Sequence, residues 1–358
     1  MSTPDKDKKI LVVGGYGNVG RIISSVLARQ FPGRVIVAGR DYQKANTFAG
    51  EIDDMIILKE WNIDSPADSD LFDNLALVIV CVEQKNTLFV EQCIQRGIDY
   101  IDISASYQFL SQVEQLDADA QQNNSTVILS VGLAPGLTNL LASYGKQLHP
   151  HLKHIDLFIL LGLGEIHGNE AVLWTLSNLN ANFSVTENNY QKLVASFVEG
   201  KQTVFSQLGT RTGYRFNFSD QQVLPYTLNL DSVSSWLCFD SQLATKMLNL
   251  AKKAGLLNIL RIKAIANMLI KASRNMHFGS DYFVIQADLL GSGRDVNRYS
   301  ISGYGEGKTT GLVAAEVANR LLQSSFPPGV FHIEQLFEAK EFIQAVCSQD
   351  SEFKFVSS

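Results

Sequence analysis

The chain has 358 residues, of which 46% are hydrophobic and 18% charged, and its formal net charge is −6. This composition is typical of a globular protein of about two domains. The mild acidity gives no electrostatic reason to bind nucleic acid or an anionic membrane. No run of about 18 uncharged apolar residues predicts a membrane span, and the polar start of the chain predicts no secretory signal. The four cysteines form no C-x-x-C pair, which favours reduced thiols in a cytoplasmic protein.

The first 130 residues alternate between short aliphatic runs and segments with helical periodicity. The runs are almost entirely apolar, as expected of strands that are buried on both faces of a parallel sheet. They lie at residues 9–13, 34–38, 55–58, 77–82, 100–104 and 126–131. Strand and helix units that alternate at this length predict an α/β fold with a doubly wound parallel sheet of the Rossmann type.

The stretch GGYGNVG lies where the first predicted strand turns into the first predicted helix. Its glycines at 15, 17 and 20 fit the G-x-G-x-x-G spacing of dinucleotide-binding loops. In such a loop the missing side chains let the backbone approach a pyrophosphate, and the helix N-terminus offers unpaired N–H groups. The sequence therefore predicts a cofactor-binding loop formed by Gly15, Tyr16, Gly17, Asn18, Val19 and Gly20.

The end of the second predicted strand, VAGRD, bears on which nicotinamide dinucleotide is bound. An NAD-selective site places an acid here for the ribose 2′-hydroxyl, whereas the 2′-phosphate of NADP calls for arginine. Gly39 stands at the position of the acid and Arg40 follows it. Arg40 therefore favours NADP as the cofactor. NAD stays open as an alternative because Asp41 is an acid one step later.

The ends of two further strands predict additional cofactor contacts. Ligands of open parallel sheets bind beyond the carboxyl ends of the strands. Cys81, Val82 and Ser104 stand at such ends, so we expect them near the cofactor, mostly through their backbone. No nearby residue would activate Cys81 as a nucleophile, which favours a packed thiol.

After residue 131 the pattern changes to strands of which several alternate in polarity, with helical segments around 240–253 and 256–272. This pattern predicts a second, α+β domain with a mixed sheet, followed by a helical tail. We expect a Rossmann domain at 1–131 and a substrate and dimerisation domain at 132–307. The tail helices within 308–347 are expected to pack back on the first domain.

The loop GLGEIHGNE contains the candidate catalytic residues. Glu165 and His167 lie between glycines, after a predicted buried strand and before a predicted helix. Such a loop can present polar side chains to a cleft, and a histidine can donate a proton near neutral pH. The alternative is an exposed loop without a catalytic role. No metal site is predicted, because the histidines of HPHLKH at 149–154 lack an accompanying cysteine or carboxylate cluster.

Several stretches together resemble the saccharopine dehydrogenase-like oxidoreductases. They are GGYGNVG with VAGRD, YIDISA, GLAPGLTNLLA, and the tail KTTGLVAAEVANRLL with PPGVFHIEQL. GLAPGLTN is the most specific, because saccharopine reductases and carboxynorspermidine dehydrogenases carry a similar G-x-x-P-G segment after the last Rossmann strand. The substrate-binding arginines of saccharopine reductases have no residue-by-residue match in this chain.

The resemblance implies a Rossmann domain, a second domain with a mixed sheet, NAD(P) and often a dimer. It also implies reduction of the imine that forms between an amine and a carbonyl compound. The expected protein is an NADP-dependent homodimeric oxidoreductase with a small, amino-acid-like substrate and no nucleic acid partner. Two alternatives stay open: an enoyl or carbonyl reductase, and a non-catalytic NADP-binding sensor or scaffold.

Overall fold

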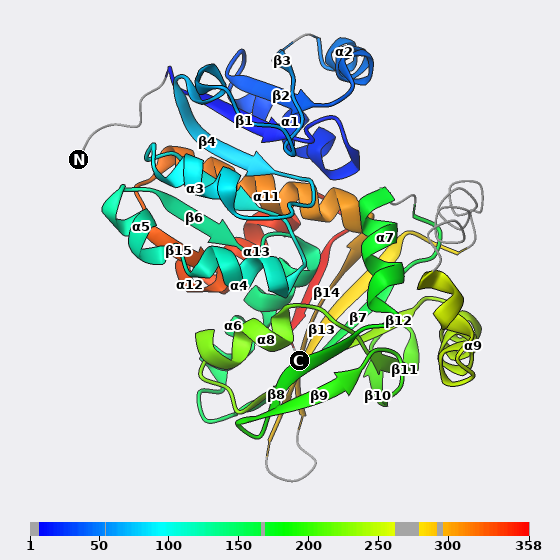
Figure 1. Ribbon diagram of the computed structural model, residues 1–358. Coiled ribbons are helices and arrows are strands. Elements are labelled where there is room, and N and C mark those ends of the chain that lie inside the picture. The colour runs from blue at the N-terminus through cyan, green and yellow to red at the C-terminus, as the bar shows by residue number, and fades with distance from the viewer. Residues whose placement is uncertain (1–6, 54, 166–168, 262–278, 292–295, 358) are drawn as a thin grey trace. The chain divides into compact units, whose positions relative to one another are not determined.

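The structure is a computed structural model that describes residues 7–53, 55–165, 169–261, 279–291 and 296–357 (Figure 1). These residues fold as two compact units. The first is formed by Met1–Gly136 with Gly307–Phe337, and the second by Leu137–Glu306 with Glu338–Ser358. The domain limits predicted from the sequence stay a prediction.

The first unit is built around a parallel sheet of seven strands in the order β15-β6-β5-β4-β1-β2-β3. Their bounds are β1 Lys9–Val13, β2 Val35–Gly39, β3 Ile56–Glu60, β4 Leu75–Val80, β5 Asp99–Asp102, β6 Thr126–Leu129 and β15 Gly329–His332. From β1 the chain adds β2 and β3 on one side, and β4, β5, β6 and β15 on the other. The loops that follow β1 and β4 therefore lead to opposite faces of the sheet. The predicted α/β fold with a Rossmann sheet is confirmed.

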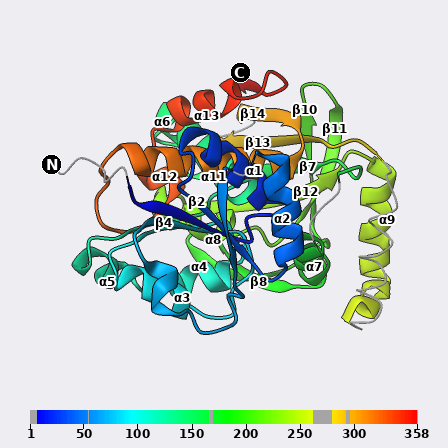
Figure 2. The same cartoon turned by 90° about the horizontal axis from the view of Figure 1, so that it is seen from above.

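Helices cover both faces of this first sheet, α1 and α11 on one and α3, α4 and α5 on the other (Figures 1 and 2). The strand residues alternate accordingly. Leu11 and Val13 belong to the same buried cluster as Phe89 of α3 and Leu110 of α4, which fixes the side on which these helices pack. The bounds are α1 Asn18–Gln30, α2 Tyr42–Glu51, α3 Leu88–Ile94, α4 Tyr107–Glu114, α5 Asp117–Gln122 and α11 Glu306–Gln323, with a short 3₁₀ turn at Ser69–Phe72.

The last strand of this sheet comes from the tail of the chain, where the sequence predicted only helices. That prediction is wrong for Gly329–His332, which form β15 and pair in parallel with β6, Val330 opposite Val127. Two helices follow it in the chain, α12 at Ile333–Leu336 and α13 at Ala339–Ser348. A strand of four residues forms here because β6 offers it a partner, not because its own pattern demands one.

The second unit contains a mixed sheet of seven strands in the order β10-β11-β12-β7-β13-β14-β16. Only β12 and β7 pair in parallel. The bounds are β7 His154–Leu161, β10 Gly200–Phe205, β11 Gly209–Arg215, β12 Ser232–Phe239, β13 Tyr282–Leu290, β14 Val296–Tyr304 and β16 Lys354–Ser357, and a separate hairpin is formed by β8 Asn182–Glu187 and β9 Tyr190–Ala195. The predicted second mixed sheet is confirmed, whereas β8, β9 and β16 were not predicted.

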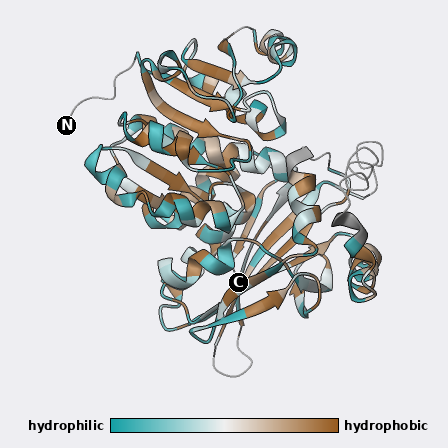
Figure 3. Cartoon of the chain, in the orientation of Figure 1, coloured by the Kyte–Doolittle hydropathy of each residue, from teal (hydrophilic) through white to brown (hydrophobic). Residues whose placement is uncertain are grey.

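One face of the second sheet is covered by helices, and the other carries apolar side chains around a buried polar network. The strands appear as bands of apolar residues in Figure 3. On the second face, Asp288 accepts hydrogen bonds from Arg298 Nε at 2.9 Å and from Thr203 Oγ1 at 2.8 Å. Lys201 of β10 also pairs with Asp156 of β7. Because β10 and β13 are four places apart in the strand order, these contacts require the sheet to curl.

Among the described residues, the helices of the second unit are α6 Thr138–Leu148, α7 Asn169–Asn178, α8 Asp220–Thr227, α9 Gln242–Lys253 and α13, with a 3₁₀ segment at Leu256–Arg261. Helices α6 and α8 contact strands β13 and β12. The helix predicted around 256–272 is thus a 3₁₀ helix up to Arg261, and the rest of it lies outside the described residues.

Candidate functional site

The predicted cofactor loop connects β1 to α1. Gly14 has a φ of 76°, a left-handed conformation that favours glycine, and the N–H of Gly17 donates to its carbonyl oxygen at 2.9 Å. The side chain of Ser24 in α1 donates to the carbonyl oxygen of Gly15 at 2.9 Å. These contacts hold the loop as one tight turn and direct the start of α1 at the carboxyl end of β1.

The three glycines of the motif differ in what surrounds them. A Cβ at Gly20 would lie 2.2 Å from the carbonyl oxygen of Gly14, and a Cβ at Gly15 would lie 2.9 Å from the Ser24 hydroxyl. Both positions therefore allow close packing of helix against strand. At Gly17 a Cβ would meet only the Gly14 carbonyl oxygen, at 3.1 Å, so the protein leaves this side of the loop open. Such a cradle fits a pyrophosphate at the helix N-terminus.

Tyr16 reaches from this loop across the end of β2. A Cβ at Gly39 would lie 2.4 Å from its ring, and its hydroxyl accepts a hydrogen bond from the backbone N–H of Asp41 at 2.8 Å. The Asp41 carboxylate caps α2, accepting from the backbone N–H of Lys44 at 3.1 Å. This hydrogen bond lowers the pKa of Asp41. Arg40, between the two, is exposed.

The loops after β4 and β5 supply the other predicted cofactor residues. The N–H of Cys81 extends the pairing of β4 with β1, donating to the carbonyl oxygen of Val13 at 2.9 Å. The side chain of Val82 lies against Gly14, where an added Cβ would meet it at 2.6 Å. Burial raises the pKa of the Cys81 thiol, and the nearby Asp102 acts in the same direction. A thiol with a raised pKa is a poor nucleophile at neutral pH, and the role of Cys81 beside the cofactor stays a prediction.

A buried carboxyl group that the sequence did not single out connects these two loops. Asp102, at the end of β5, is 1% exposed. Its Oδ1 accepts from the backbone N–H of Ser104 at 2.7 Å, and its Oδ2 accepts from the Tyr100 hydroxyl at 2.7 Å and from Gln84 Nε2 at 2.8 Å. Burial raises the pKa of Asp102 to about 7, although the Tyr100 and Ser104 hydrogen bonds oppose this. Asp102 thus fixes the backbone of Ser104, one of the predicted cofactor contacts.

Further along the same edge, a serine, a histidine and a glutamate contact one another in the order found in the catalytic triad of a hydrolase. Ser130 Oγ is 2.8 Å from His332 Nδ1, and His332 Nε2 is 2.9 Å from Glu114 Oε1. Ser130 is 0% exposed, so an acyl substrate has no access to its hydroxyl. The contacts instead join the ends of β6, β15 and α4, which explains how the tail strand is held in register.

The predicted catalytic residues belong to the second unit. Glu165 Oε2 accepts from the backbone N–H of Glu306, the first residue of α11, at 2.6 Å. This carboxylate therefore has a helix-capping contact, and its catalytic role stays a prediction. His167 lies outside the described residues.

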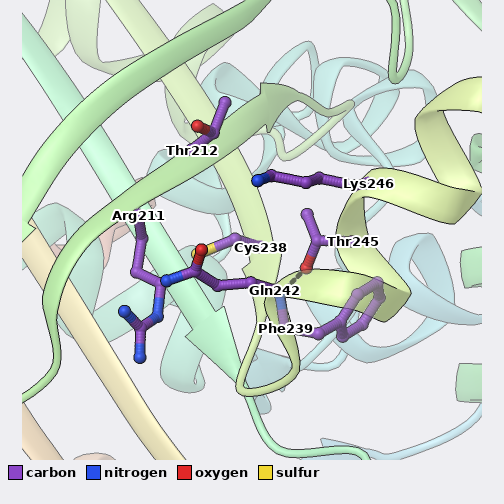
Figure 4. Close-up of a pocket in the computed structure, with 7 residues that line it drawn as sticks. All are labelled: Arg211, Thr212, Cys238, Phe239, Gln242, Thr245 and Lys246. Atoms are coloured by element: carbon purple, nitrogen blue, oxygen red, sulfur yellow. Dashed lines mark hydrogen bonds between the residues drawn. The ribbon is translucent and has the colours of Figure 1, made fainter.

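A small pocket in the second unit lies between α9 and the ends of β11 and β12 (Figure 4). It is lined by Arg211, Thr212, Cys238, Phe239, Gln242, Thr245 and Lys246. The backbone N–H of Phe239 donates to Thr245 Oγ1 at 2.9 Å, which ties the start of α9 to the sheet. None of the residues predicted to bind cofactor or to act in catalysis lines this pocket. Within the described ranges, no group of three histidine, cysteine or acidic residues is placed to hold a metal ion.

Comparison with known proteins identifies the first unit. Residues 10–128, from β1 into β6, match the family model of the saccharopine dehydrogenase NADP binding domain. No curated protein sequence matches the chain. The structure is similar to apo saccharopine dehydrogenase (L-Glu forming) from Saccharomyces cerevisiae, with a TM-score of 0.65 and 15% sequence identity over 98% of this chain and 100% of that chain. At this identity the likeness concerns the fold.

Two other solved structures align over nearly the whole chain with lower scores. GenD2 from gentamicin A biosynthesis, in complex with NAD, has a TM-score of 0.44 and 12% identity over 100% of this chain and 98% of that chain. A probable dehydrogenase from Thermotoga maritima has a TM-score of 0.45 and 8% identity over 97% of this chain and 98% of that chain. The domain match and the loop geometry point the same way: residues 10–128 form an NADP-binding domain of the saccharopine dehydrogenase type, and the chain is an NAD(P)-dependent oxidoreductase.

Proposed function

We propose that this oxidoreductase uses NADPH to reduce the C=N bond of an imine formed between an amine and an amino-acid-like carbonyl compound. The cofactor supplies the hydride. The residues of this chain bind and orient it: the backbone of residues 15–20 would hold the pyrophosphate, and Cys81, Val82 and Ser104 would border its nicotinamide half. The imine class comes from the family resemblance, in which the known reactions reduce such bonds.

The preference for NADP rests on one observation, the Tyr16 ring above Gly39. An acid that read the ribose 2′-hydroxyl would stand at position 39, and any side chain there would overlap this ring. The next acid, Asp41, caps α2 with its carboxylate and lies 3.3 Å from Lys44 Nζ. The exposed guanidinium of Arg40 is the remaining group at this position, and it suits a 2′-phosphate.

Arg40→Ala is expected to weaken NADP binding and to leave NAD binding nearly unchanged. A net hydrogen bond to a charged group contributes about 1.5–3 kcal/mol, which corresponds to a loss of about 10–150-fold in affinity. The preference for NADP should also decrease with rising salt, because Arg40 is exposed. Titration calorimetry of both cofactors against both proteins measures these effects.

Arg29→Ala is the matched control for this experiment, because Arg29 is an exposed arginine in the last turn of α1. That turn lies one helix length from the cofactor loop, so the control should bind both cofactors like the unmodified chain. A wild-type preference for NAD would overturn the proposal and would assign the reading of the ribose hydroxyls to Asp41.

For the proton that the developing amine receives, we propose His167, with Glu165 of the same loop as the second candidate. The capping contact of Glu165 with α11 engages its Oε2, which favours the histidine. In the pH profile of kcat, His167→Ala should remove the limb that reports the general acid. An unshifted profile would assign the proton to another group.

The substrate class is tested by following NADPH oxidation with mixtures of carbonyl compounds and amines, and separately with enoyl thioesters. Turnover that requires both an amine and a carbonyl compound supports imine reduction. Turnover with carbonyl compounds alone or with enoyl thioesters would favour the alternative reductases, and NADP binding without any turnover would favour a sensor. We further propose a homodimer, as the family resemblance implies, in the cytoplasm, as the cysteine usage favours.

A further inference from the structure

Helix α9 of the second unit is turned with its apolar side to the solvent. Leu243, Met247 and Leu250 lie on one side of the helix and are 69%, 60% and 65% exposed. Thr245 and Asn249, on the opposite side, are 2% and 4% exposed. An ordinary surface helix buries its apolar stripe and exposes its polar one, so the arrangement of α9 is inverted.

Polar contacts fix this orientation. Thr245 Oγ1 accepts from the Phe239 N–H at 2.9 Å and donates to the carbonyl oxygen of Ser241 at 3.0 Å. Asn249 Nδ2 donates to the carbonyl oxygen of Phe197 at 2.6 Å. The bond to Ser241 lies within the helix, but turning the leucines inward would break the bonds to Phe239 and Phe197 and leave those buried groups without partners, at a cost of about 1–3 kcal/mol for each. The hydrogen bonds of the polar side therefore keep the apolar side of α9 facing the solvent.

The sequence around α9 differs in charge from the rest of the chain. Between Asp240 and Asp281 there is no acidic residue, whereas seven residues are basic: Lys246, Lys252, Lys253, Arg261, Lys263, Lys271 and Arg274. The net charge of −6 thus combines +7 in this segment with −13 elsewhere. The acidic net charge of the whole chain therefore conceals a basic stretch of sequence that includes the lysines of α9.

We propose that the outward face of α9, formed by Leu243, Met247 and Leu250 with the exposed lysines Lys246 and Lys253 along its edge, docks on an anionic lipid membrane. A helix with an exposed apolar stripe beside lysines lies in the plane of the headgroups, its apolar side chains inserted and its cations near the lipid phosphates. In Figures 1 and 2, α9 lies at the outer side of its unit beside β11 and β12.

The charges favour a membrane over a second copy of the chain as the partner. A symmetric contact between two α9 helices would bring Lys246 and Lys253 close to the same residues of the other copy, and like charges disfavour such a contact. The attachment is peripheral: among the helices that the structure describes, none is long and apolar enough to cross a membrane.

The test is flotation of the full chain with vesicles of phosphatidylcholine alone and of phosphatidylcholine mixed with phosphatidylglycerol. We expect the chain to float with the mixed vesicles only, and to be released by high salt. Lys246→Gln with Lys253→Gln should weaken binding about 25-fold, since each basic residue near the surface contributes about fivefold. Leu243→Gln with Leu250→Gln should weaken vesicle binding by at least about tenfold, because two leucines that insert into the membrane are lost.

Matched controls change similar side chains elsewhere in the second unit. Leu193→Gln replaces a leucine of β9 that is 70% exposed, and Lys340→Gln replaces an exposed lysine of α13. Both controls should bind the mixed vesicles like the unmodified chain. The proposal is overturned if the chain does not float with the mixed vesicles, or if the controls lose binding to the same extent. It is also overturned if the α9 variants change only the oligomeric state in sedimentation equilibrium.

Discussion

Gly17→Val should abolish the binding of NADP and of NAD while the first unit keeps its fold. Gly17 has a φ of −71° and a ψ of 176°, which any residue can adopt, and its Cβ would meet only the Gly14 carbonyl oxygen. The valine would therefore project into the open side of the loop, where we propose that the pyrophosphate lies. Losing two or more charge-assisted hydrogen bonds corresponds to a loss of at least about 100-fold in affinity. Titration calorimetry measures the loss, and thermal unfolding without cofactor checks the fold.

Gly20→Ala provides the contrast within the same loop. Its Cβ would lie 2.2 Å from the Gly14 carbonyl oxygen and 2.8 Å from the Gly15 Cα, so α1 must move away from β1. Overpacking of this kind costs about 1–3 kcal/mol of stability, and Gly20→Ala should unfold earlier where Gly17→Val does not. Undiminished cofactor affinity in a folded Gly17→Val variant would contradict the assignment of this loop to the pyrophosphate.

Asp102→Asn should make the chain more stable relative to the wild type as the pH rises. A free aspartate ionises near its ordinary pKa of 3.8, whereas burial keeps Asp102 protonated in the fold up to about pH 7. Between these values the folded chain holds a proton that the unfolded chain has released, so the free energy of unfolding falls as the pH rises. This difference in the pKa of Asp102 between the folded and the unfolded chain corresponds to about 4 kcal/mol of stability. Asparagine does not titrate, so the variant avoids this loss.

Urea unfolding of both proteins at several pH values between about 4 and 8 measures the effect as a difference between the two curves. Asparagine can keep the hydrogen bond from the Ser104 N–H, and once the Gln84 amide turns over, the asparagine nitrogen can donate to Gln84 Oε1, which is buried without a partner in the described structure. Asp73→Asn, at an exposed position, is the control and should follow the wild type. Parallel curves for Asp102→Asn and the wild type would show that Asp102 is ionised in the fold.

The sequence by itself determined the parts of this protein that depend on local pattern. Short apolar runs separated by helical periodicity specified the parallel strands, because a strand buried on both faces needs apolar residues throughout. The spacing of Gly15, Gly17 and Gly20 placed the turn between β1 and α1, because that turn tolerates no side chain at two of these positions. The family resemblance was confirmed over the same domain.

The features that only the tertiary structure decided depend on groups far apart in the sequence. Four residues became β15 because β6, about 200 positions earlier, offered free backbone groups in parallel register. The pKa of Asp102 depends on its burial beside Tyr100 and Gln84, which no local pattern reveals. The orientation of α9 depends on the Phe197 carbonyl oxygen and the Phe239 N–H, which hold the polar side of the helix against the sheet. A hydrophobic pattern predicts that a helix is amphipathic, but the polar partners in the fold decide which side it buries.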